Sequence, residues 1–261
     1  MTGVYRIGRA AWALPKAHLA EFPAEGTHLQ RYAARFSAVE INSSFYRPHR
    51  PATYARWAAS VPADFRFSVK VPKTITHQHR LTGVDSLLDA FLREVTELGE
   101  KLGCLLVQLP PSLEWVEPTS DAFLSSLRAR FGRPVVIEPR HPTWFTDEVT
   151  ERLCAHQVGR VAADPVRIPE AAEPAGWLEI VYYRLHGSPR SYYSNYDEAY
   201  LDRLAERLRA EATRAREVWC VFDNTARDHA TPNALGLIDR LLGGQTPNSS
   251  LERSAQAFGR A

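Results

Sequence analysis

The sequence alternates short β-rich apolar segments with longer amphipathic segments from one end to the other. The apolar segments are rich in Val, Ile, Phe and Tyr, which favour pleated strands. Strands are therefore expected at Val4–Gly8, Ala38–Asn42, Arg66–Val71, Cys104–Leu109, Val135–Glu138, Arg160–Ala163, Val181–His186 and Val218–Asn224.

Amphipathic helices are expected between these strands. The clearest is Asp85–Lys101, where Leu88, Phe91 and Val95 recur at helical spacing. Only the segment Ile168–Trp177 reads as an irregular loop. The other expected helices are Thr27–Phe36, Thr53–Ser60, Asp121–Phe131, Asp147–His156, Asp197–Ala215 and Thr231–Leu242.

Strands that alternate with helices predict a parallel sheet, because parallel neighbours need a crossover connection. Eight such units in 261 residues match a single α/β domain, a (β/α)8 barrel of the TIM type. An open, doubly wound sheet is the alternative. We expect the barrel to occupy residues 1–242, followed by a loosely packed tail at 243–261 that begins with Gly, Ser and Asn.

Charge and cysteine content narrow the class of protein. The chain has 32 Lys and Arg against 30 Asp and Glu, so nucleic acid stays possible as a partner but is not indicated. The three cysteines are far apart and never form a C-x-x-C pair, which fits a reducing compartment. We find no apolar run long enough for a signal peptide or a membrane span, and therefore expect a cytoplasmic protein with no membrane partner.

Polar residues recur on one face of the expected strands. Because side chains alternate across a strand, Glu40 and Asn42 lie opposite the apolar residues of their segment. The apolar face should contact the helices, and the polar face should point to the barrel axis near its C-terminal mouth, where barrel enzymes carry their active sites. The alternative is that these charges only neutralise one another. The polar positions are Glu40, Asn42, Arg66, Ser68, Lys70, Gln108, Glu138, Arg140, Asp164, Arg184, His186, Asp223 and Asn224.

These residue types suggest roles. Glu40 and Glu138 are candidates for a general acid/base pair, and His186 for a proton shuttle. An anion site is predicted from the cations Lys70, Arg140 and Arg184, because guanidinium groups bind phosphate and carboxylate. His186 and the amides of the Gly187 loop are expected to help. The candidate ligand-binding residues are Asn42, Lys70, Gln108, Arg140, His141, Arg184 and Asn224.

Several runs resemble one known family in residue type and order. They are Val39–Tyr46, Phe67–Pro72, Gln108–Pro111, Glu138–His141, Tyr183–Gly187 and Phe222–Asn224. Between Val4 and Leu242 the chain resembles domain-of-unknown-function family 72, the YecE-like proteins. The resemblance implies a barrel and little about activity, because the family lacks an assigned function.

The chain departs from that family's pattern at two places near the expected mouth. Where the family usually has Gly-Thr/Ser-Ser-Gly-Trp after the first strand, this chain has Gly8–Trp12, with Arg9 and Ala11 in the run. Where the family's eighth strand usually ends in two Asn, this chain has Asp223 followed by Asn224. Both departures leave open whether a family ligand is kept.

The resulting hypothesis is an enzyme of the hydrolase or isomerase type that acts on a small anionic, phosphorylated or sugar-like substrate. A barrel that only binds an anion or a nucleic-acid end is the alternative, and it gains if Glu40 and Glu138 are both held in ion pairs. A metal-dependent barrel nuclease would use Glu138, Asp164, His186 and Asp223, but nearby cations oppose a metal. We therefore expect no metal site and no cofactor, and the phosphate loops and serine or zinc motifs of other enzymes are missing.

Overall fold

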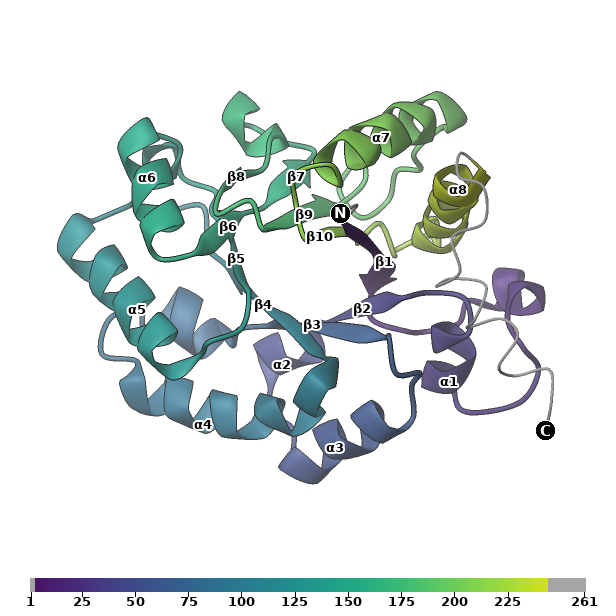
Figure 1. Cartoon of the computed structure of the whole chain (residues 1–261), viewed down its shortest axis with the longest axis horizontal. Coiled ribbons are helices and arrows are strands. Elements are labelled where there is room, and N and C mark those ends of the chain that lie inside the picture. The colour runs from purple at the N-terminus through teal and green to yellow at the C-terminus, as the bar shows by residue number, and fades with distance from the viewer. Residues whose placement is uncertain (1–2, 244–261) are drawn as a thin grey trace.

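The computed structural model describes residues 3–243, whose strands form a ring surrounded by helices (Figure 1). The strands are β1 (Val4–Ala10), β2 (Ala38–Ile41), β3 (Arg66–Lys70), β4 (Leu102–Gln108), β5 (Val135–Glu138), β6 (Val158–Arg160), β7 (Ala162–Asp164), β8 (Ala175–Gly176), β9 (Ile180–Leu185) and β10 (Glu217–Phe222). The helices are α1 (His28–Ala33), α2 (Ser43–Tyr46), α3 (Pro51–Ala59), α4 (Asp85–Val95), α5 (Glu117–Arg130), α6 (Asp147–Ala155), α7 (Glu198–Glu211) and α8 (Ala230–Gly243). Shorter turns are η1 (Lys16–Glu21), η2 (Thr74–Gln78), η3 (Thr96–Lys101), η4 (Pro142–Trp144) and η5 (Pro169–Ala172).

The sheet runs in the order β7-β9-β10-β1-β2-β3-β4-β5-β6-β8. β6 and β7 are separated in sequence by Val161 alone; β6 pairs with β5, and β7 pairs with β9. The segment Val158–Asp164 therefore pairs with β5 through its first half and with β9 through its second half. These two pairings nearly close the barrel. The predicted α/β barrel is confirmed. Its ten strands arise from this split and from β8, which pairs antiparallel with β6.

Apolar side chains form two layers, as the alternation along the strands predicts. Val39, Ile41 and Phe67 belong to the large cluster beneath the helices. A second, smaller cluster fills the barrel interior, where the rings of Tyr182 and Trp219 stack with centroids 5.8 Å apart. The interior is thus a packed core, and it supports the polar residues above it.

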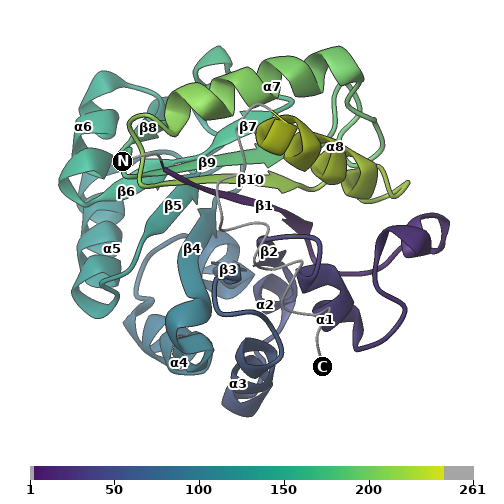
Figure 2. The same ribbon diagram turned by 45° about the vertical axis from the view of Figure 1, so that its right-hand side comes forward.

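The helices differ from the predicted ranges mainly at their ends. The expected helix Asp85–Lys101 ends as α4 at Val95, and η3 follows it with a positive φ of 53° at Gly99. α8 begins at Ala230; it packs beside α7 and against β1 and β10 (Figure 2). Within residues 3–243 we find no helix with the length and apolar character that a membrane crossing requires. The predicted tail at 243–261 lies outside the described residues except for Gly243.

Candidate functional site

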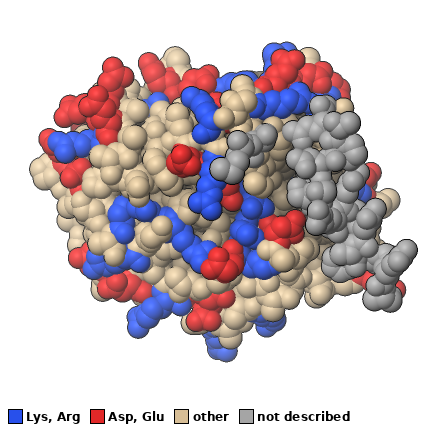
Figure 3. Space-filling view, in the orientation of Figure 1, with Lys and Arg blue, Asp and Glu red and all other residues tan. Residues whose placement is uncertain are grey.

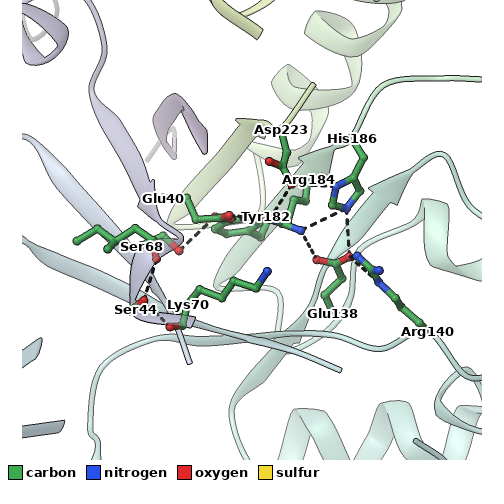
Figure 4. Close-up of polar contacts among 11 residues, drawn as sticks. Glu40, Ser44, Ser68, Lys70, Glu138, Arg140, Tyr182, Arg184, His186 and Asp223 are labelled. Carbon is green, nitrogen blue, oxygen red and sulfur yellow. Dashed lines mark hydrogen bonds and ion pairs between the residues drawn. The ribbon is translucent and has the colours of Figure 1, made fainter. Parts of the chain in front are cut away.

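One arginine, Arg184 near the end of β9, holds three carboxylates at the mouth of the barrel (Figure 4). Its Nε and Nη2 donate to the Glu40 carboxylate over 3.0 and 2.8 Å. Its Nη1 lies 3.1 Å from Glu138 Oε2, and its Nη2 also lies 2.9 Å from Asp223 Oδ2. The side chains of Arg184, Glu40 and Glu138 are 1%, 0% and 3% exposed, so these charges interact with little screening by water.

The strand period places these residues together. Each charged residue follows a side chain of the interior layer by two positions, so it points to the same face one step nearer the C-terminal end. β2, β5, β9 and β10 all end at this mouth because the sheet is parallel there. The interior residues that precede Glu40, Glu138, Arg184 and Asp223 are Ala38, Val136, Tyr182 and Val221.

His186 lies between two of the carboxylates. Its Nε2 is 3.2 Å from Glu138 Oε1, and its Nδ1 is 3.1 Å from Asp223 Oδ2. Burial and the Arg184 charge favour the neutral ring, but Glu138 and Asp223 outweigh them and raise the pKa of His186. Burial likewise works against ionised Glu138, yet Arg184 and His186 hold the pKa of Glu138 well below its usual range. Glu138 is therefore an anion at neutral pH, and its charge and that of Asp223 favour the protonated form of His186.

Glu40 is bound by Tyr182 of the barrel interior as well as by Arg184. The hydroxyl of Tyr182 donates to Glu40 Oε2 over 2.9 Å and lies 3.2 Å from Ser68 Oγ. Burial and the Glu40 charge raise the pKa of Tyr182 well above its ordinary value, so the hydroxyl keeps its proton. Glu40 is thus fully engaged on both sides.

The other two predicted cations have different environments. Arg140 donates through Nε and Nη2 to Glu138 Oε1, over 3.3 and 2.9 Å, and its Nη1 has no partner within the described chain. Lys70, at the end of β3, makes no ion pair with any described residue, and its Nζ lies 4.2 Å from the centre of the Phe45 ring. Of the three predicted anion-binding residues, Arg184 is saturated internally, whereas Arg140 and Lys70 keep donors free.

A pocket of about 350 Å³ opens beside this cluster. Glu138, Arg140 and His186 form its charged wall, and Arg167 from the segment after β7 lines it too. Arg167 is exposed and forms no hydrogen bond or ion pair with residues 3–243. We call this cavity the mouth pocket. Its lining includes Glu138, Arg140, Phe145, Arg167, His186 and Tyr192.

Several predicted ligand residues have other partners. His141 caps η4 by accepting from the Thr143 amide, and Asn224 donates to Ser194 O and Asn233 Oδ1. The predicted help from the Gly187 loop is wrong for Gly187 itself, since its amide donates to the Tyr196 hydroxyl over 2.8 Å.

Two further predicted residues remain candidates at the mouth. Gln108 is buried at the end of β4 in register with Glu138, and no hydrogen bond joins its side chain to the described residues. Asn42 follows β2, and its enclosed Oδ1 lacks a hydrogen-bond partner in the same part of the chain. Their ligand-binding roles stay predictions.

Sequence reasoning missed two contributors to this mouth, Tyr182 and Arg167, and misjudged a third. Asp223 was named as a strand-end residue and as a metal ligand of the nuclease alternative, but it was left out of the anions that neutralise the three cations. Tyr182 lies two residues before Arg184, so the alternation of side chains along the strand already predicted that both point to the barrel interior. Arg167 lies in an irregular segment, where no strand period indicates the direction of a side chain.

The two departures from the family pattern, at Gly8–Trp12 and at Asp223, affect the mouth differently. Arg9 points toward the helix layer, where it lies over the Tyr32 ring and donates to Thr231 Oγ1 over 2.7 Å. The first departure therefore places no charge at the mouth, although Ala11 adopts a φ of 63°. Asp223 lies in the charged cluster itself, so the second departure changes the charge of the site.

No group of three or more His, Cys, Asp or Glu in residues 3–243 is arranged to hold a metal ion. Glu138, His186 and Asp223 are close together, but Arg184 donates to both carboxylates and both His186 nitrogens are engaged. The donor atoms a metal would need are already bound to protein cations. The described residues therefore do not form the ligand set that a metal-dependent nuclease needs.

Comparisons with known proteins agree on one family. A family model described as "Protein of unknown function DUF72" matches residues 6–256. The chain is 36% identical over 174 residues to the UPF0759 protein YecE of Escherichia coli K12, which covers 64% of this chain and 61% of that protein. The matched region is thus less than two thirds of that relative's length.

A second relative and a solved structure match over more of their length. The UPF0759 protein YunF of Bacillus subtilis is 23% identical over 267 residues, covering 90% of this chain and 94% of that protein. A crystal structure of a DUF72 family protein from Enterococcus faecalis superposes with a TM-score of 0.80 at 22% identity, covering 94% of this chain and 97% of that one. The structural match supports the barrel fold alone.

Proposed function

This chain belongs to the uncharacterised DUF72 family, and from its barrel mouth we propose that it binds a small molecule with a phosphate or carboxylate group. The observation that carries the proposal is the mouth pocket, where Arg140 and Arg167 present guanidinium donors that the described chain does not use. Guanidinium groups bind such anions through paired hydrogen bonds. A volume of about 350 Å³ suits a small metabolite.

The charge balance of the mouth supports an anion. Glu40, Glu138 and Asp223 carry three negative charges, and Lys70, Arg140 and Arg184 offer three positive ones. A protonated His186 and the exposed Arg167 then leave the site positive. A ligand anion would remove this excess.

The pocket also offers surfaces for the rest of a ligand. Phe145 and Tyr192 belong to its wall, and the Tyr192 ring meets His186 edge-on with centroids 5.9 Å apart. Aromatic rings bind the apolar faces of sugars and planar rings. Nucleic acid is the weaker alternative, because the 32 Lys and Arg of the sequence are nearly balanced by 30 Asp and Glu. On the face drawn in Figure 3, acidic and basic side chains are interspersed.

The enzyme hypothesis is narrowed by the ion pairs. Glu40 and Glu138 were predicted as an acid/base pair, but each is bound to Arg184, and Glu138 stays ionised at neutral pH. Because both carboxylates are held in ion pairs, a binding site is favoured over acid/base catalysis by Glu40 and Glu138. If the protein is a hydrolase or isomerase, we assign proton transfer to His186, whose pKa is raised by Glu138 and Asp223.

Titration with inorganic phosphate and sulfate, followed by thermal unfolding, tests the proposal. The wild-type protein should gain stability as the anion concentration rises, because only the folded state presents the site. Arg140→Ala and Arg167→Ala should each weaken binding about tenfold or more, since a charge-assisted hydrogen bond contributes about 1.5–3 kcal/mol. Arg152→Ala, which removes an exposed arginine paired with Glu117 on the outer helices, is the matched control. A wild-type protein that gains no stability, or pocket variants that bind like the control, would refute the proposal.

A further inference from the structure

Lys70 is a buried cation of the mouth that has no anionic partner among residues 3–243. Its side chain is 6% exposed, yet no described carboxylate lies within ion-pair distance of Nζ. The Phe45 ring, 4.2 Å away, is the nearest compensating group recorded for it. Figure 4 shows the amine pointing toward Arg184 and Glu138, with no hydrogen bond drawn to it. The amine is therefore available for a reaction.

The groups that face Lys70 come from several elements and partly oppose one another. Burial and the Arg184 charge on β9 disfavour the ammonium form, while Glu40, Glu138 and Asp223 favour it. The effects of burial and of Arg184 are the larger, and they lower the pKa of Lys70 to about 8. About one tenth of the amine is then neutral at pH 7, compared with about 1 in 2,500 for an ordinary lysine.

Charged neighbours link Lys70 to the proposed anion site. The charges of Lys70 and Arg140 both lower the pKa of His77 on η2, after the larger effect of burial, so both lie close to the same imidazole. His77 is fixed by Thr76 Oγ1 at 2.8 Å and by an edge contact with Phe45. Figure 4 shows the Lys70 amine and the Arg140 side chain on either side of the Glu138 carboxylate. We infer that one small molecule at this carboxylate can contact both cations.

We propose that Lys70 is a nucleophilic amine that forms an imine with an aldehyde or ketone carrying a carboxylate or phosphate group. The inference deepens the proposed function and rests on it, because the anionic group would be held by Arg140. Unpaired lysines in desolvated sites form such imines with carbonyl substrates.

The step balances without a redox partner. The lone pair of the neutral amine attacks the carbonyl carbon, a C–N bond forms, and the carbonyl oxygen takes up a proton. The C–O bond then breaks, and both hydrogens of the amine leave with the oxygen as one molecule of water. His186, in the same cluster, is the group that can supply and recover the proton.

The test uses the whole protein with glyoxylate, an aldehyde that carries a carboxylate, and cyanoborohydride to reduce the imine to carboxymethyl-lysine. The chain contains only four lysines, Lys16, Lys70, Lys73 and Lys101, so peptide mass spectrometry can follow each one. We expect Lys70 to be modified at least tenfold faster than Lys16 at pH 7. Lys73, whose Nζ lies 5.8 Å from the centre of the Tyr46 ring, is a matched lysine with a ring contact outside the cluster.

Lys70→Arg should abolish the fast adduct, whereas Lys73→Arg should leave it unchanged. Should Lys70→Arg fail to fold, the comparison among the lysines of the wild-type chain still decides the matter. Lys70 labelling no faster than Lys16 or Lys73, while phosphate still stabilises the protein, would overturn the imine and leave the anion site standing. Glycolaldehyde, which is neutral and similar in size, should react at least tenfold more slowly than glyoxylate at Lys70. Equal rates would overturn the anionic substrate class and count against the proposed function as well.

Discussion

Replacing Arg184 with methionine tests whether the mouth is organised around one guanidinium. Methionine keeps much of the side-chain volume but leaves Glu40, Glu138 and Asp223 without their shared cation. Breaking a buried ion pair costs about 3–5 kcal/mol, because the remaining charge is buried and unpaired. With Glu40 and Glu138 almost fully buried, we expect the upper end of that range at pH 7. For a chain of this size that corresponds to a fall in Tm of about 10–20 °C.

The cost should depend on pH in a defined direction. In the wild type the pKa of Glu138 is depressed, so its contribution to stability is present above the unfolded value, near 4, and is lost as pH falls through the folded value. Without Arg184, only His186 and Arg140 oppose the effect of burial, so the pKa of the same carboxyl is lowered less. The difference between wild type and Arg184→Met should therefore shrink as pH falls from 7 to 3, mainly below about pH 4.

Thermal unfolding followed by circular dichroism at both pH values measures this difference. Arg152→Met is the matched control, because Arg152 pairs with Glu117 at an exposed site and its side chain is 44% exposed. Exposed pairs contribute about 0–1 kcal/mol. An Arg184→Met variant as stable as the control at pH 7, or a cost that does not fall between pH 7 and pH 3, would refute the account of the cluster.

Three smaller perturbations follow from the same structure. Asp223→Asn should lower the pKa of His186 in an NMR titration, and less stability would then be lost as pH rises through that pKa; an unchanged pKa would contradict the contact between them. Gly103→Ala should destabilise the fold by about 1–3 kcal/mol in urea unfolding, because the new Cβ would lie 2.5 Å from the buried Trp219 ring; a neutral result would show that the interior can yield. Ala11→Val should cost about 1–2 kcal/mol at a φ of 63° while Ala11→Gly is tolerated, and equal stabilities would argue against the left-handed backbone.

The alternation of strand residues carried most of what the sequence could reveal. It placed Glu40, Glu138 and Arg184 on the interior face, because a period of two survives in every strand whatever surrounds it. It could not show which charges meet. Arg184 reaches Glu40 from a position 144 residues away, and that pairing depends on barrel geometry.

Other features lay beyond local pattern. Arg167 enters the mouth pocket from irregular chain, and the Gly187 amide turns to Tyr196 because of the path of its loop. The expected helix at Asp85–Lys101 stops early because Gly99 adopts a positive φ within an otherwise amphipathic stretch. Composition predicts none of these, since each depends on the direction of backbone segments that have no period.

The long reach of Arg184 also bears on how the chain can fold. Its carboxylate partners lie 144 residues before it on β2, 46 residues before it on β5, and after it beyond β10. A nascent or truncated chain that ends before β9 has the interior acids without their cation, so a half-barrel has little to gain by burying them. Contacts so distant in sequence slow folding and make it cooperative. Isolated N-terminal fragments should consequently fail to show protected amides in hydrogen exchange, and the barrel should form as one unit when its last strands arrive.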